Sequence, residues 1–191
     1  MIEHLFVSKV RAKLLRLFFL DVQQEIHIRG IVRMIDEEIN AVRRELKNLA
    51  AATILISERR GNRVYYSVNR RCPIYYELLG LVHKEYGLGG IVLKHRDDLG
   101  PTIFAVITTA YIEDHHPSQF DIDLLLIGDI NLKTAGSMIK ESEETTGREI
   151  RYTIMTQDDF EFRKKKRDAF VMNVLEKHKI MLVGDENRLL S

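Results

Sequence analysis

Apolar residues recur at helical spacing in three successive segments near the start of the chain. The first pattern predicts a helix over residues 9–21, with Ser8 placed to cap it. The second predicts a shorter helix from Gln23 to Ile35, although Gly30 inside it costs up to about 1 kcal/mol relative to alanine. The third predicts a helix over residues 37–52, whose apolar stripe is formed by Ile39, Val42, Leu46 and Leu49.

Two β-like runs follow these helices, from Thr53 to Ser57 and from Arg63 to Val68. The segment between them ends in Gly61-Asn62, a pair that is typical of a hairpin turn. Three helices followed by a two-stranded hairpin with a basic tip are the pattern of a winged helix-turn-helix domain. We therefore expect such a domain over residues 1–72.

The rest of the chain alternates between strand-like and helix-like segments. Pro73 marks a break, and residues 73–100 are expected to form a helical connector, with helices at Ile74–Tyr86 and Ile91–Asp98. Further strands are expected at Ile103–Thr108, Phe120–Ile127, Glu149–Met155 and Ile180–Val183. Further helices are expected at Leu132–Thr145 and, with room for a break, at Asp158–His178. The alternation predicts a second domain over residues 101–191 and an α/β fold class with two domains.

Composition argues against a membrane span and favours a cytoplasmic protein. No apolar run approaches the roughly 20 residues that a bilayer-crossing helix needs. Met1 to Val10 mixes charged and apolar residues, unlike a cleavable signal peptide. Cys72 is the only cysteine, so an intrachain disulfide is impossible and a reducing cytoplasm is expected. Because Cys72 has no partners at metal-ligand spacing, we interpret it as structural or incidental.

Charge is distributed unevenly along the chain. Residues 1–71 hold 14 Lys or Arg against 8 Asp or Glu, a net +6, and residues 72–191 hold 15 against 20, a net −5. A basic front joined to an acidic back is typical of a nucleic-acid-binding module fused to another domain, although chance also produces modest imbalances.

The third predicted helix divides its side chains between an apolar stripe and a polar face. A recognition helix needs this division, because long donors must reach base edges in the major groove. The candidate DNA contacts are Asn40, Arg43, Arg44 and Lys47 on this helix and Arg59, Arg60, Asn62 and Arg63 around the hairpin tip. A charged helix face is usually only solvated, but three helices followed by a basic hairpin favour the DNA interpretation.

Two stretches, LFVSKVRAKLLRLFF and AVRRELKNLAAATILISERRGNRVYYSVN, resemble the ArsR-type winged helix. More narrowly, almost the whole chain resembles prokaryotic regulators in which that module precedes a minimal nucleotidyltransferase domain. The resemblance implies that the second domain is a small nucleotidyltransferase-like α/β domain with a mixed sheet. The cysteine pair of the metal-sensing regulators is missing here, so metal sensing is not expected.

Asp121 and Asp123 lie in QFDIDLLLIGD, where residues two apart on a strand would share one face. Two such carboxylates can hold the Mg²⁺ pair that clamps a nucleoside triphosphate and activates an incoming hydroxyl. The alternative is a strand-end pair that faces water. His115 and His116, in the loop before the pair, are more typical of a solvated loop than of a metal site.

The nucleotidyltransferase resemblance adds further candidate residues. In that family a strand ends in Gly-Ser before the Asp-x-Asp motif, whereas here it ends in Thr108-Thr109, with 11 residues between Thr109 and Asp121. These threonines are the candidate nucleotide-binding residues. Thr109 would supply the serine's hydroxyl, but the branched Thr108 is expected to obstruct the close approach to phosphate that glycine allows. The family's third carboxylate position falls at Arg151, with Glu149 as an imperfect substitute.

Together these features favour a cytoplasmic transcription regulator that binds double-stranded DNA as a homodimer. Its second domain is expected to have lost catalysis and to serve dimerisation or ligand sensing, with a nucleotide as the candidate ligand. The alternative is an active Mg²⁺-dependent nucleotidyltransferase that the winged helix directs to its target. Its catalytic candidates would be Asp121, Asp123 and Glu149, of which the two aspartates would bind the metal. A toxin–antitoxin component is a third alternative, based on family analogy alone.

Two other segments each allow two interpretations. Tyr75 and Tyr76 belong either to a dimer helix or to the core of their own domain. The run from Lys164 to Arg167 either contacts DNA phosphates or is a solvated helix face.

Overall fold

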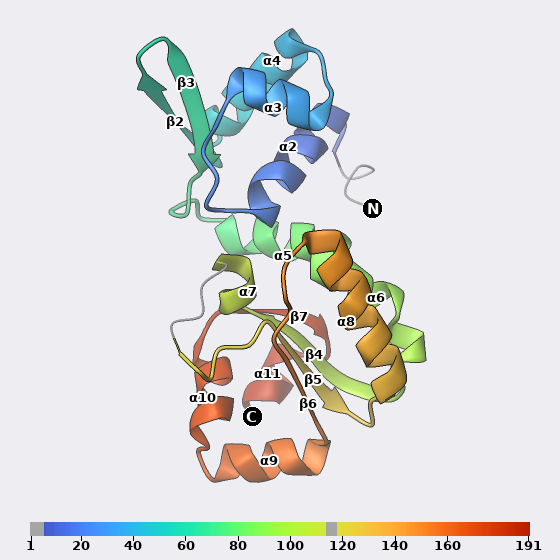
Figure 1. The fold of residues 1–191 in the computed structure, drawn as a ribbon. Helices are drawn as coiled ribbons and strands as arrows, with labels where there is room; N and C mark the ends of the chain where they lie inside the picture. Colours follow the sequence, from blue (N-terminus) through green and yellow to red (C-terminus); the bar gives the residue numbers. More distant parts are fainter. Residues whose placement is uncertain (1–5, 114–117) are drawn as a thin grey trace. The chain divides into compact units, whose positions relative to one another are not determined.

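A computed structural model describes residues 6–113 and 118–191 of the chain (Figure 1). The fold is mixed α/β, with one three-stranded antiparallel sheet and one four-stranded mixed sheet. The chain divides into two compact units, Met1–Glu85 and Tyr86–Ser191. The division falls inside the segment 73–100 that was expected to be a connector.

Three helices form the core of the first unit, as their apolar periodicity predicts. They are α2 (Lys9–Leu20), α3 (Ile28–Ile35) and α4 (Ile39–Ala51). Ser8 caps α2 by accepting a hydrogen bond from the Arg11 amide at 3.2 Å. The fully buried side chains that the helices share include Leu14, Phe18, Ile31, Val42 and Leu46. The predicted first and third helices are therefore confirmed.

The second helix begins five residues later than predicted. Ile26 and His27 form the short strand β1 (Ile26–His27), which pairs with Tyr66 and Tyr65. His27 then caps α3, because its Nδ1 accepts a hydrogen bond from the Gly30 amide at 3.1 Å. A Cβ added to Gly30 would lie 2.9 Å from Ile26 Cγ2. Glycine at this helical position therefore allows β1 and α3 to pack closely.

The hairpin consists of β2 (Leu55–Arg60) and β3 (Arg63–Val68) (Figure 1). The strand order of its sheet is β1-β3-β2, with β3 in the centre. The prediction of a first strand from Thr53 to Ser57 is corrected at both ends. Thr53 has a left-handed φ of 57° and belongs to the turn after α4, while the ladder continues to the pair Arg60–Arg63. Arg59 and Arg60 are therefore strand residues, and the turn is confined to Gly61 and Asn62.

Helix α5 (Tyr75–Glu85) completes the first unit. Tyr75 is buried, with its ring 6.0 Å from that of Phe19, which supports its core interpretation, whereas Tyr76 is half exposed. Cys72 is also buried, and its carbonyl accepts a hydrogen bond from the Tyr75 amide.

The second unit is built on a four-stranded sheet of order β6-β5-β4-β7. Its strands are β4 (Thr102–Thr108), β5 (Leu124–Gly128), β6 (Tyr152–Met155) and β7 (Lys179–Val183). Strands β5 and β6 are parallel and the other pairs are antiparallel. All of β5 is buried, as its continuous apolar run predicts.

Helices cover both faces of this sheet (Figure 1). The helices of this unit are α6 (Gly87–Lys94), α7 (Thr109–Glu113), α8 (Leu132–Thr146), α9 (Gln157–Lys165), α10 (Ala169–Glu176) and α11 (Glu186–Leu190), with a 3₁₀ turn at Arg96–Asp98. Of these, α7 directly follows β4 at the end of the sheet. Phe160 of α9, Val171 of α10 and Leu189 of α11 share one core with Val106 and Leu125 of the sheet. Helices α6 and α8 pack together on the other face.

Several predicted boundaries in this unit are corrected. The strands expected from Phe120 and Glu149 begin only at Leu124 and Tyr152, because side-chain hydrogen bonds to the backbone turn the chain before each one. The helix expected from Ile91 begins at Gly87. The long helical stretch is broken at Arg167, where φ is 53°, and Asp168 caps α10.

Within the described ranges, no helix combines the length and apolar character needed to cross a membrane.

Candidate functional site

The outer face of α4 carries the polar residues that the sequence singled out. Asn40, Arg43, Arg44 and Lys47 are exposed, whereas Val42, Leu46 and Leu49 are buried beneath them. The N-terminus of the helix is capped by Glu38, whose carboxylate accepts hydrogen bonds from the Asn40 and Ala41 amides. These backbone hydrogen bonds lower the pKa of Glu38. The exposed polar face of α4 therefore belongs to a helix whose opposite side packs in the core and whose N-terminus is capped.

A groove of about 440 Å³ lies where α3, α4 and the hairpin meet. It is lined by His27, Ile28, Arg29, Ile39, Arg43, Asn62, Arg63 and Val64. Of these described lining residues, three are arginines and none is acidic. The side chains of Arg29, Arg43 and Arg63 make no hydrogen bond or ion pair with any residue that the structure describes. The groove is therefore strongly cationic and suited to an anion.

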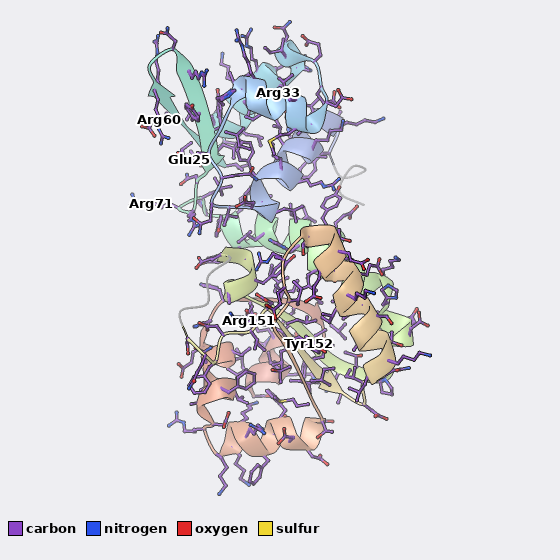
Figure 2. The ribbon with its side chains drawn as sticks, viewed as in Figure 1. Glu25, Arg33, Arg60, Arg71, Arg151 and Tyr152 are labelled. Carbon is purple, nitrogen blue, oxygen red and sulfur yellow. The ribbon has the colours of Figure 1, made fainter. Side chains whose placement is uncertain are left out.

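Arg29 was missed at the sequence level. The predicted second helix began at Gln23, five residues before α3. The prediction therefore did not distinguish the exposed helix face with Arg29 and Arg33 from the buried face with Ile31 and Ile35. Both arginines are exposed on α3, and Figure 2 labels Arg33. The four-residue spacing of the two arginines, offset from the buried isoleucines, is the signal that could have identified them.

The remaining cations of the hairpin differ in their surroundings. Arg60 and Glu25, both labelled in Figure 2, form an ion pair with an N–O distance of 2.6 Å. Arg60 also lies 2.5 Å from Glu58, and its guanidinium lies 5.3 Å from the Tyr65 ring centre. Hydrogen bonds to Glu58 and Glu25 raise the pKa of Arg60. The Arg59 Nε donates to the Gly61 carbonyl at 3.3 Å. Of the predicted tip residues, Arg60 is thus neutralised by two carboxylates, while Arg63 opens onto the groove.

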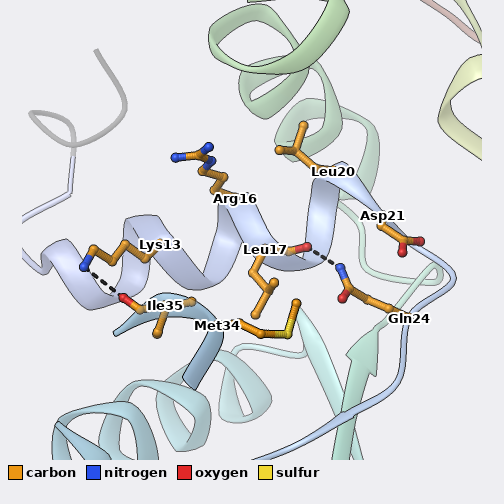
Figure 3. Close-up of a pocket in the computed structure, with 8 residues that line it drawn as sticks. All are labelled: Lys13, Arg16, Leu17, Leu20, Asp21, Gln24, Met34 and Ile35. Atoms are coloured by element: carbon orange, nitrogen blue, oxygen red, sulfur yellow. Dashed lines mark hydrogen bonds between the residues drawn. The ribbon is translucent and has the colours of Figure 1, made fainter. Parts of the chain in front are cut away.

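A second hollow of the first unit, of about 510 Å³, lies between α2 and α3 (Figure 3). It is lined by Lys13, Arg16, Leu17, Leu20, Asp21, Gln24, Met34 and Ile35. The Lys13 ammonium is held by the Ile35 carbonyl at 3.0 Å and by Glu37 at 2.6 Å. The Gln24 amide donates to the Leu17 carbonyl. Its polar groups are thus used within the protein, which sets this hollow apart from the arginine groove.

Asp121, in the second unit, is almost fully buried and has three hydrogen-bond donors. Its Oδ1 accepts from Lys177 Nζ at 2.5 Å and from Asn173 Nδ2 at 2.9 Å, and its Oδ2 accepts from the Ser118 amide at 2.8 Å. Burial alone would raise the pKa of Asp121, but these hydrogen bonds outweigh it and lower the pKa.

Asp123 is fully buried and has different partners. Its Oδ2 accepts a hydrogen bond from the Arg151 amide at 2.8 Å, and its Oδ1 lies 3.6 Å from Arg148 Nη2. The Arg148 guanidinium also stacks 4.5 Å from the Tyr111 ring centre. Because both aspartates precede β5, the expected pair of side chains on one strand face is not formed.

The other predicted nucleotide-site residues do not form one cluster, although Thr108 lines the same small cavity as Asp121. Thr108 is buried, and its hydroxyl donates to the Ile122 carbonyl. Glu149 is exposed and precedes β6. The Thr109 side chain, His115 and His116 lie outside what the structure describes. Of the basic run, Lys164 donates to the Leu189 carbonyl, and Lys165, Lys166 and Arg167 are exposed.

These contacts do not fit a Mg²⁺ pair. Mg²⁺ requires oxygen ligands in octahedral geometry, whereas Asp121 and Asp123 face the cationic side chains of Lys177 and Arg148. No group of three or more His, Cys, Asp or Glu residues suited to a metal occurs in the described part of the chain.

Comparisons of the chain with protein-family models, with curated proteins and with solved structures give no match.

Proposed function

We propose that the chain is a DNA-binding transcription regulator whose first unit is a winged helix-turn-helix domain. The observation that carries this proposal is the groove in which Arg29, Arg43 and Arg63 converge without an acidic lining residue. The described residues that line the groove provide positive charge and no negative charge. A polyanion bound there would balance the three arginines. Double-stranded DNA fits best, since an exposed polar helix face adjoins the groove.

The proposed recognition helix is α4. Asn40, Arg44 and Lys47 would meet base edges and phosphates in the major groove, because they lie on the exposed face of a helix of 13 residues. The β2–β3 hairpin would act as the wing, with Arg63 against the neighbouring backbone. Arginine suits this role because its planar fork matches phosphate oxygens.

The proposed role of the second unit is non-catalytic. We expect a nucleotidyltransferase-like scaffold that serves dimerisation or ligand sensing, in a homodimer that reads two half-sites in the cytoplasm. The partners of Asp121 and Asp123 support this role over metal-dependent nucleotidyl transfer, because they compete with the metals that such transfer needs.

The proposal is tested by DNA binding of the full chain. A duplex is first selected from a random-sequence pool, and its affinity is then measured by fluorescence anisotropy at several salt concentrations. We expect Arg43→Ala and Arg63→Ala each to weaken binding, by about 1–3 kcal/mol for a base contact. A phosphate contact would instead reduce the slope of log K against log salt by about 0.9.

Lys133→Ala is the matched control, because Lys133 is an exposed cation at the start of α8 in the other unit. It should bind like wild type. Selection that recovers no duplex, or arginine variants that bind as tightly as the control, would overturn the proposal.

A further inference from the structure

Asp121 is a buried carboxylate that forms an ion pair with one side-chain cation among the described residues. Its side chain is 1% exposed, and the Lys177 ammonium lies 2.5 Å from its Oδ1. Asn173 and the Ser118 amide donate further hydrogen bonds. Those two donors are neutral, so they satisfy the oxygens but not the charge. Lys177 is therefore the group that balances Asp121.

The lysine reaches the carboxylate from the surface. Lys177 follows the last residue of α10, where its backbone is extended with ψ at 158°. Its side chain is 39% exposed, although the carboxylate that it contacts is not. A lysine can lie in this way because its long apolar stem packs along the protein while the ammonium meets a polar group. Asp121, Thr108, Asn173 and Lys177 all line the same small cavity.

A charge buried like that of Asp121 needs a counter-ion. Removing one partner of a buried ion pair typically costs several kcal/mol, because the other charge is left without compensation. In metal sites a divalent cation supplies this compensation, and carboxylate and amide oxygens are its preferred ligands. The Asp121 carboxylate is a ligand of that kind, whereas the Asn173 amide turns its Nδ2 towards the carboxylate and donates to it at 2.9 Å.

We propose that the Lys177 ammonium occupies the position at Asp121 that a divalent cation would otherwise take. The second unit therefore carries its own cation and needs no metal to fold. Asp123 follows the same pattern, since the Arg148 guanidinium, 3.6 Å away, supplies a positive charge there. This inference concerns the second unit alone and does not depend on DNA binding by the first.

The test uses the full chain with Lys177→Met, which keeps most of the length of the side chain and removes its charge. Thermal unfolding is followed in EDTA and in millimolar Mn²⁺, and Mn²⁺ binding is followed by electron paramagnetic resonance. Wild type should unfold at the same temperature in both solutions and bind no Mn²⁺. In EDTA the variant should unfold roughly 10 °C lower, and Mn²⁺ should restore most of the loss.

Three further variants separate the charge effect from simple packing. Lys177→Arg keeps the cation and should behave like wild type. The double variant Asp121→Asn/Lys177→Met has no buried charge to compensate, so Mn²⁺ should neither bind to it nor stabilise it. Lys133→Met controls for the loss of a lysine at an exposed position.

The outcomes that would overturn the proposal are specific. One is a wild-type chain that Mn²⁺ stabilises and that loses this response in Asp121→Asn. Another is a Lys177→Met variant as stable as wild type, or one whose lower unfolding temperature is the same with and without Mn²⁺. If the variant does not fold in EDTA, refolding on addition of Mn²⁺ supports the proposal and failure to refold overturns it.

Discussion

Arg60, the last residue of β2, donates a hydrogen bond of 2.6 Å to Glu25, which immediately precedes β1. Glu58 accepts from the same guanidinium, and Tyr65 lies beneath it. The Tyr65 ring in turn meets His27, the cap of α3, edge-on at 5.7 Å. These contacts connect the hairpin to the start of α3, so Arg60 is placed to hold the hairpin, and we expect it to act in this way and not through a DNA contact.

Arg60→Met and Arg63→Met should therefore differ in their salt dependence. For Arg63→Met we expect the slope of log K against log salt to fall by about 0.9, because a phosphate contact is lost. For Arg60→Met we expect weaker binding with an unchanged slope, because the hairpin is less well oriented and no phosphate contact is lost. Anisotropy titrations at four or more salt concentrations measure both. Equal losses of slope would show that Arg60 contacts DNA directly.

Arg29→Ala should weaken DNA binding more than Arg33→Ala. Both arginines are exposed on α3, but only Arg29 lines the groove with Arg43 and Arg63. The expected difference is about 1 kcal/mol or more, measured by the same titration on the selected duplex. Equal effects of the two substitutions would remove the groove from the proposed interface.

Glu45 should make the stability of the first unit sensitive to acid. Burial raises its pKa, but hydrogen bonds from Arg11, Ser8 and Asn48 outweigh this, so the net pKa is lowered from 4.5. A depressed pKa contributes stability above the unfolded-state pKa, and this stability is lost as pH falls through the folded-state pKa. We therefore expect stability to decline as the pH falls below about 4.5, the unfolded-state pKa.

The check is urea unfolding of wild type and Glu45→Gln as a function of pH. At pH 7 the variant should lose about 2 kcal/mol, the typical worth of a charge-assisted hydrogen bond such as that from Arg11 at 2.9 Å. As the pH falls through the lowered folded-state pKa of Glu45, the two curves should converge. If the unfolding free energies of wild type and Glu45→Gln differ by the same amount at every pH, protonation of Glu45 is not the cause of the acid sensitivity.

Gly30→Ala and Gly136→Ala should have opposite effects on stability. Both glycines lie inside helices, where alanine is intrinsically favoured by up to about 1 kcal/mol. A Cβ at Gly136 would meet no atom within 4 Å, whereas one at Gly30 would lie 2.9 Å from Ile26 Cγ2. Gly136→Ala should therefore raise the free energy of unfolding and Gly30→Ala should lower it. A stabilising Gly30→Ala would show that β1 moves easily away from α3.

The order of the longer elements was predictable from the sequence, because apolar periodicity records which face of each helix or strand is buried. The short elements β1, α7 and α11 were not predicted. The exposed face of α4 followed directly from the stripe of Val42, Leu46 and Leu49. The start of α3 did not, because the pairing of β1 with Tyr65 and Tyr66 joins residues 38 or more positions apart.

The surroundings of Asp121 and Asp123 could not be predicted in the same way. The Asp-x-Asp spacing indicated a shared strand face. Both side chains instead accept hydrogen bonds from backbone amides, and the strand begins after them, at Leu124. Lys177 lies 56 positions beyond Asp121 and belongs to another element. No local pattern links the two, since their contact arises only when α10 packs against the sheet.

Cys72 gives the first unit a built-in reporter of local opening. It is the only thiol in the chain, it is 6% exposed, and it lies within the unit that ends at Glu85. A thiol-reactive dye can label it only when the surrounding structure opens, so the labelling rate measures the opening free energy of this unit. The same rate measured with and without DNA would show how far the ligand stabilises the first unit, whatever the second unit does.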